Sequence, residues 1–133
     1  MHRSLIIALG GATILAGSSI GTSQAGASGP SLFTSAQSAA GGKTYAANCS
    51  KCHGANLEGV SAPALRGSGS GLAGDSVGEA FTFISTQMPA GNPGSLSTTE
   101  YTNVLAFILT RNGHTAGKTS LTPALAKASK IKV

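Results

Sequence analysis

The residues from 26 to 113 include too few large apolar side chains to fill a hydrophobic core of ordinary size. Val, Ile, Leu and Phe together number 16 of these 88 residues, about 18%, whereas folded domains usually exceed roughly 20%. Three segments nevertheless carry clear helical patterns, which are not typical of a disordered chain. We therefore expect a folded domain whose core is completed by a bulky apolar cofactor.

The strongest helical pattern runs from residue 97 to residue 112. Ser97 and Glu100 have the spacing of a capping box, and Gly113 is a typical residue to end the helix. The apolar residues of one face follow at i, i+3, i+4, i+7 and i+8: Tyr101, Val104, Leu105, Ile108 and Leu109. The spacing predicts a helix with one buried face.

A second helix is predicted to begin near Asp75. Ser76 and Glu79 form another capping box, and Pro89 closes the segment just after Met88. Its apolar stripe consists of Val77, Phe81 and Ile84.

A third helix is predicted from Thr34 to Ala47. Its Gly41 and Gly42 weaken it as an isolated helix but would let a second helix approach its backbone closely. After residue 25 the chain has four Val, three Ile and no alternating run long enough for a sheet. We predict an all-α fold, with Gly-, Ser- and Pro-rich loops between the helices.

The chain's only two cysteines fall in the run Cys49-Ser50-Lys51-Cys52-His53. This is the form that marks covalent attachment of a c-type haem. Two thiols one helical turn apart can add to the two vinyl groups on one edge of a porphyrin, and the adjacent imidazole can then bind the iron. The pattern predicts one covalent haem c, with Cys49 and Cys52 as thioether anchors and His53 as an iron ligand.

Three other interpretations of the same residues are less favourable. A structural disulfide across two residues would close a tiny loop and add little stability. A thioredoxin-like redox pair would begin a helix in a βαβ unit, whereas these cysteines end a helix in a chain without strands. A zinc site would have to combine Cys49, Cys52, His53 and the distant His114. Haem attachment is the favoured interpretation.

An electron-carrying haem needs a second axial ligand. Met88, 35 residues after His53, becomes the only methionine once Met1 leaves with the N-terminal segment described below. A lone methionine is often a core filler, but a haem motif upstream favours ligation. His114, the competitor, lies beyond the far end of a helix about 24 Å long. We predict Met88 as the second ligand.

The N-terminal residues 1–25 are expected to be a signal peptide. Arg3 precedes an uncharged stretch from Leu5 to Ile20, and Ser23-Gln24-Ala25 supplies the small residues of a cleavage site. The alternative is an uncleaved membrane anchor, for which the stretch is short and interrupted by glycines and serines. The signal peptide predicts export to the periplasm.

Charge is unevenly divided along the rest of the chain. Residues 26–113 have four basic and four acidic residues, whereas residues 114–133 have four lysines and no acid. We therefore predict a haem domain over 26–113 and a basic, flexible C-terminal tail over 114–133, able to contact an acidic partner or an anionic membrane surface. Nucleic-acid binding is excluded because the domain lacks a basic stripe interleaved with aromatics.

Residues 32 to 113 resemble the class I cytochromes c. Gly42 and Tyr45 match the positions where that family crosses its first and last helices, and Val104 and Phe107 match the positions that meet them. The resemblance implies a small monohaem fold of about three main helices.

The resemblance also implies a role for Pro63, ten residues after His53. A proline there gives its carbonyl to the histidine ring, which fixes the orientation and tautomer of the ring. The chain departs from the mitochondrial relatives because it has no tryptophan and no ring of lysines around the haem edge. Arg66 is the one nearby basic residue that could pair with a haem propionate, although a solvent-facing arginine is the favoured interpretation.

A narrower resemblance extends from Met88 to Leu96 and on to Asn112-Gly113. This part is similar to cytochrome domains that serve bacterial quinoprotein alcohol dehydrogenases. It implies such a dehydrogenase and a terminal oxidase as redox partners.

We predict a monomeric periplasmic electron carrier and not an enzyme, because four dispersed carboxylates build no acid–base site. Two alternatives stay open. One is a haem subunit held permanently in a quinoprotein dehydrogenase complex. The other is an open-site haem sensor or enzyme, in which Met88 does not bind the iron.

Overall fold

A computed structural model describes residues 30–133, so the predicted signal peptide lies outside the described residues. That part of the chain contains five helices and no strand, which confirms the all-α prediction. The helices are α1 (Ser35–Asn48), α2 (Ser50–His53), α3 (Val77–Gln87), α4 (Thr98–Arg111) and α5 (Pro123–Ala128). From Pro30 onward, no helix has the length and apolar character needed to cross a bilayer.

The three long helices begin where the sequence predicts, because each starts with a capping box. In α3 the Ser76 hydroxyl accepts from the Glu79 amide, and the Glu79 carboxylate accepts in return from the Ser76 amide at 2.7 Å. Ser97 and Glu100 repeat the arrangement in α4. The hydrogen bonds from Ser76, with that from its backbone amide the largest cause, hold the pKa of Glu79 below its usual range.

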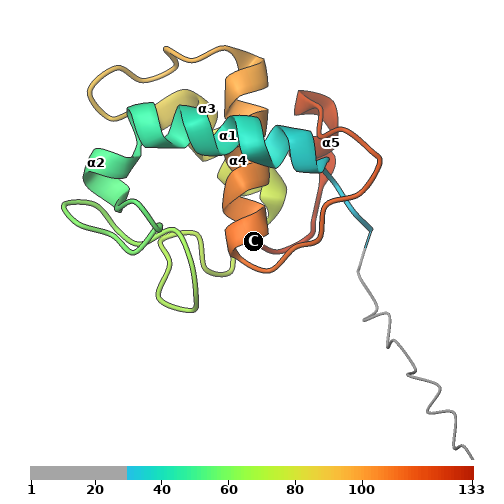
Figure 1. Cartoon of the computed structure of the whole chain (residues 1–133), viewed down its shortest axis with the longest axis horizontal. Helices are drawn as coiled ribbons and strands as arrows, with labels where there is room; N and C mark the ends of the chain where they lie inside the picture. Colours follow the sequence, from blue (N-terminus) through green and yellow to red (C-terminus); the bar gives the residue numbers. More distant parts are fainter. Residues whose placement is uncertain (1–29) are drawn as a thin grey trace, which may run out of the picture.

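Helices α1 and α4 cross in close contact (Figure 1). Gly41 is buried at the crossing, where a Cβ atom would overlap the carbonyl group of Asn103. One residue later, a Cβ on Gly42 would lie 3.3 Å from the Phe107 ring. The Tyr45 and Phe107 rings pack with their centroids 5.2 Å apart. The predicted glycine positions therefore do permit a close approach, and Gly41 makes the tighter of the two contacts.

The apolar core lies around this crossing and under α3. Its largest fully buried side chains are Tyr45, Phe33, Phe81, Leu57, Leu105, Ile108, Leu109 and Val77. The α4 face predicted from sequence supplies three of these eight residues, Leu105, Ile108 and Leu109, and α4 runs through the centre of the molecule (Figure 1).

Residues 114–133, which the sequence predicts to be a flexible tail, pack in the structure against the N-terminal half of α1. The amide of Gly117 donates to the Phe33 carbonyl at 2.8 Å. The side-chain amide of Gln37 pairs with the backbone of Leu121, donating at 2.8 Å and accepting at 2.7 Å. Leu121 itself is buried.

The same segment continues along α3. The Val77 amide donates to the Ile131 carbonyl at 2.8 Å, and the Val133 amide donates to the Asp75 carbonyl at 3.0 Å. Within α5, Ala126 is fully buried, and Pro123 is the first residue of the helix. Most of these hydrogen bonds join backbone groups and do not depend on lysine side chains, although the Lys132 ammonium group donates to the Gly74 carbonyl. Charge alone therefore could not reveal the packing.

Candidate haem-binding site

A cavity of about 440 Å³ opens between α1, α3, α4 and the loops that join them. Its volume falls within the range of about 300–1,000 Å³ that small-molecule and cofactor sites occupy. Cys49, Cys52, His53 and Met88 all line it. The structure therefore brings the predicted thioether anchors and both predicted iron ligands together around one space.

The cysteine motif is held by a tight turn between two helices. Cys49 is both the C-cap residue of α1 and the N-cap residue of α2. Its carbonyl accepts hydrogen bonds from the amides of Cys52 and His53. The Cys52 carbonyl accepts in turn from the amides of Val60, Ser61 and Ala62. This local bonding places both thiols and the imidazole on the same wall of the cavity.

The His53 ring is oriented by the backbone of Pro63. The Nδ1 atom of His53 lies 2.7 Å from the Pro63 carbonyl. A carbonyl can only accept, so Nδ1 carries the proton and Nε2 keeps the lone pair that a metal requires. Pro63 itself does not line the cavity, so it acts on the imidazole from behind.

Met88 lies on the wall formed by the end of α3. It is the C-cap residue of that helix, its amide donates to the Ile84 carbonyl at 3.2 Å, and its side chain is half-buried. Ile84 lines the cavity as well. The apolar stripe of α3 thus leads directly into the methionine, as its spacing in the sequence predicts.

His114 and Arg66 lie away from the cavity. His114 follows α4, where its amide donates to the Leu109 carbonyl, and it is not among the lining residues. Arg66 is exposed and does not line the cavity either.

The competing uses of the two cysteines fit the structure poorly. Both cysteines are free thiols. Burial, together with the neighbouring Cys52, raises the pKa of the Cys49 thiol to about 11, whereas a redox-active pair lowers it. Across residues 30–133, no three His, Cys, Asp or Glu side chains cluster closely enough to hold a metal ion by themselves. Neither a thioredoxin-like pair nor a zinc site is supported.

Two tyrosine contacts at the cavity were not predicted from the sequence. The Tyr45 hydroxyl donates to the Gly54 carbonyl at 2.7 Å, and the Tyr101 hydroxyl donates to the Met88 carbonyl at 2.5 Å. Sequence reasoning assigned both residues only to helix packing. A buried tyrosine usually needs a hydrogen-bond partner for its hydroxyl. Because these are the chain's only tyrosines, that rule could have indicated that both hydroxyls make such bonds.

The lining has the chemistry that a porphyrin requires. Four of the five motif residues and Met88 line the cavity, and most of the remaining wall is apolar, including Leu65, Leu72, Phe83, Val104 and Ile108. Free thiols, a histidine with its Nε2 lone pair available and a thioether face the same space. The residues present therefore fit a covalently attached haem c.

Comparison with known protein families agrees with this chemistry. Residues 36–108 match the family described as "Cytochrome C oxidase, cbb3-type, subunit III". The chain is also similar to a chain in the crystal structure of the sulfane dehydrogenase SoxCD from Paracoccus pantotrophus. That similarity has 32% sequence identity and a TM-score of 0.47, and it covers 56% of this chain and 43% of that chain. No curated protein matches the sequence.

The family match covers the helices that build the cavity together with the whole cysteine motif. Members of this family hold haem c covalently and use it for electron transfer. The chain belongs to the cytochrome c family described as cbb3-type cytochrome c oxidase subunit III.

Proposed function

We propose that the protein is a periplasmic electron carrier in which His53 and Met88 are the axial ligands of one haem c. The observation that carries the proposal is that both side chains line one cavity with Cys49 and Cys52. When bound, the haem supplies iron that alternates between ferrous and ferric states. A thioether ligand favours the ferrous state and keeps the potential high.

The chain's own residues have three tasks in this function. Cys49 and Cys52 fix the cofactor covalently, and Pro63 keeps the proton on Nδ1 of His53. The apolar lining excludes water from the iron and so keeps it in a medium of low dielectric constant. Several of the exposed lining residues, including Ala47, Ser61 and Ala90, have small side chains, so a partner could come close to the cofactor where they lie.

Replacing Met88 with alanine tests the axial assignment. We expect Met88→Ala to lower the reduction potential by on the order of 100 mV, within the roughly 0.8 V that axial ligands span. The reduced variant should also bind carbon monoxide rapidly. Potentiometry and optical spectroscopy of the holoprotein measure both effects.

His114→Ala is the control, and it should change neither property. If Met88→Ala leaves the potential and the spectrum unchanged, Met88 is not a ligand. If the wild-type protein already binds carbon monoxide rapidly, the protein is an open-site haem sensor or enzyme and not a carrier.

We propose an acidic redox protein as the partner, with a quinoprotein alcohol dehydrogenase as donor and a terminal oxidase as acceptor. A shallow groove of about 610 Å³ runs along α3, and Lys127 and Lys130 line it. The groove also includes Phe83, which is 49% exposed and lines the haem cavity as well. A partner attracted by the lysines would therefore lie one aromatic ring from the haem. Glu79 is the one acidic residue that lines the groove, and its carboxylate accepts a hydrogen bond from the Ser76 hydroxyl.

Charge reversal tests this docking surface. We expect the double variant Lys127→Glu, Lys130→Glu to slow electron transfer with an acidic partner several-fold at low ionic strength and to match the wild type at high salt. The control, Lys43→Glu with Lys118→Glu, has the same net charge but changes lysines outside the groove.

Equal slowing by both pairs would mean that only net charge matters. Binding to anionic vesicles without any effect on the protein partner would assign the lysines to a membrane surface instead. Isolation in stoichiometric amount with a large quinone-containing subunit would mark the chain as a permanent subunit of a dehydrogenase.

A further inference from the structure

The two tyrosines of the chain make parallel contacts on opposite sides of the haem cavity. Tyr45 on α1 donates its hydroxyl proton to the carbonyl of Gly54, the residue after His53. Tyr101 on α4 donates to the carbonyl of Met88 itself. Both side chains are at least 96% buried and both line the cavity. Each predicted axial ligand therefore has one tyrosine hydroxyl bonded to its own segment.

The Tyr101 hydroxyl also ties together the two ends of the loop that carries Met88. Besides donating to Met88, it accepts from the Leu96 amide at 3.4 Å. The Met88 carbonyl accepts a second hydrogen bond, from the Gly94 amide at 3.2 Å. Residues 88 and 96 are thus joined through a single side-chain oxygen.

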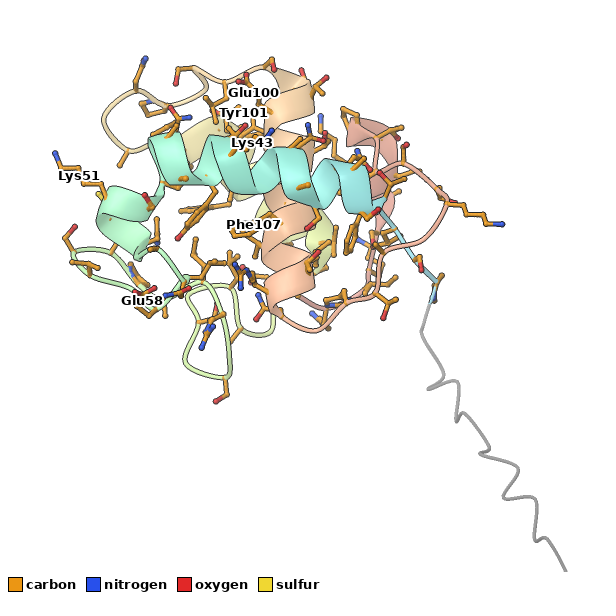
Figure 2. All side chains as sticks on the ribbon, viewed as in Figure 1. Lys43, Lys51, Glu58, Glu100, Tyr101 and Phe107 are labelled. Atoms are coloured by element: carbon orange, nitrogen blue, oxygen red, sulfur yellow. The ribbon has the colours of Figure 1, made fainter. Side chains whose placement is uncertain are left out.

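The ring that carries this oxygen is itself rigidly placed. Tyr101 lies in the first turn of α4, which the Ser97 and Glu100 capping box fixes at its start. Figure 2 shows Tyr101 and Phe107 along α4, on either side of its crossing with α1. Because Gly41 brings the two helix backbones into contact, α4 cannot shift easily relative to α1.

We propose that Tyr101 is a positioning residue for the methionine ligand: its hydroxyl holds the Met88 backbone so that the thioether stays directed at the iron. This inference rests on the proposed ligation by Met88. Without the hydroxyl, the Met88 carbonyl would keep only its bond from Gly94. The loop would then move away from the cavity more often, and the iron would be exposed to other ligands for a larger fraction of the time.

The test compares Tyr101→Phe with Tyr45→Phe in the holoprotein. Each variant removes one buried hydroxyl bonded to a carbonyl and keeps the ring that packs in the core. The probe is imidazole, titrated against the ferric protein, with the apparent affinity and the association rate read from the optical spectrum. Urea unfolding of both variants measures the loss of global stability.

We expect Tyr101→Phe to raise the apparent affinity for imidazole about fivefold, the factor that corresponds to one net hydrogen bond. Tyr45→Phe should stay within about twofold of the wild type, because its partner lies on the histidine side. Each variant loses one hydroxyl-to-carbonyl bond, and Tyr101→Phe also loses the long bond of 3.4 Å from the Leu96 amide. The loss of global stability in Tyr101→Phe should therefore equal or slightly exceed that in Tyr45→Phe.

Two outcomes would overturn the positioning role. Unchanged imidazole binding in Tyr101→Phe would show that the hydroxyl does not hold the ligand, and an equal increase in both variants would show a general loss of stability only. Met88→Ala keeps these outcomes separate from the ligand assignment. If that variant binds imidazole no better than the wild type, Met88 is not the ligand and the proposed ligation itself is wrong.

Discussion

The Cys49→Ser, Cys52→Ser double variant is expected to lose its haem and, with it, its cooperative unfolding transition. The cavity of about 440 Å³ lies between α1, α3 and α4. Leaving an apolar volume of that size unfilled would cost up to about 11 kcal/mol, at roughly 24 cal/mol per Å³. This is comparable to the 5–15 kcal/mol that stabilises a typical domain. Far-ultraviolet circular dichroism and urea titration measure the loss.

Ser50→Ala is the matched control inside the motif. The Ser50 hydroxyl donates only to the Ala46 carbonyl, so this variant should keep its haem and its unfolding transition. A cofactor-free double variant that still unfolded cooperatively would show that residues 30–133 form a sufficient core without the haem.

Gly41→Ala is expected to destabilise the protein by more than about 3 kcal/mol, beyond the usual range for overpacking. The added methyl group would overlap the Asn103 carbonyl and lie 2.9 Å from the Val104 amide nitrogen. These are backbone atoms in the middle of α4, so no side-chain rotation can relieve the overlap. The midpoint of urea unfolding measures the effect.

Gly42→Ala supplies the comparison at the next position. Its methyl group would lie 3.3 Å from the Phe107 ring, which can move by a few tenths of an ångström. Alanine is favoured over glycine in a helix by about 1 kcal/mol, so this variant should lie close to the wild type in stability. Equal losses at residues 41 and 42 would contradict the close crossing.

The helices and the anchoring motif could be predicted because their signals are local. Ser97 and Glu100 are three residues apart, and they identify the start of α4 without any knowledge of the rest of the fold. Cys49, Cys52 and His53 are likewise read from five adjacent residues. The apolar stripe of α3 also points to Met88, because the helix ends at that residue.

Which of two adjacent glycines makes the helix crossing could not be predicted in the same way. Gly41 and Gly42 differ by about 100° around the helix axis, and only the position of α4 decides between them. The sequence comparison with class I cytochromes c indicated Gly42, which does meet Phe107. The closest backbone contact is instead at Gly41.

The packing of residues 114–133 was missed for a different reason. Its main contacts are made by backbone atoms, such as the Gly117 amide and the Ile131 carbonyl. Such contacts leave no pattern of residue types, and the four lysines of the segment have the composition of a mobile, solvated end. Leu121 and Ala126 are its buried side chains, too few to form a recognisable periodic face.

The contacts of residues 114–133 with the rest of the fold indicate the order in which the two sides of the haem cavity form during folding. The Gln37 side chain bonds to Leu121, 84 positions away in the sequence. Closing a loop of this length has a high entropic cost, so the contact should form only after other contacts have shortened the loop. The histidine side needs only links within about ten residues, such as that from His53 to Pro63. The segment braces the start of α3, and Met88 caps the end of that helix. Folding should therefore complete the histidine wall early and make the methionine wall rigid last, when the C-terminal segment docks.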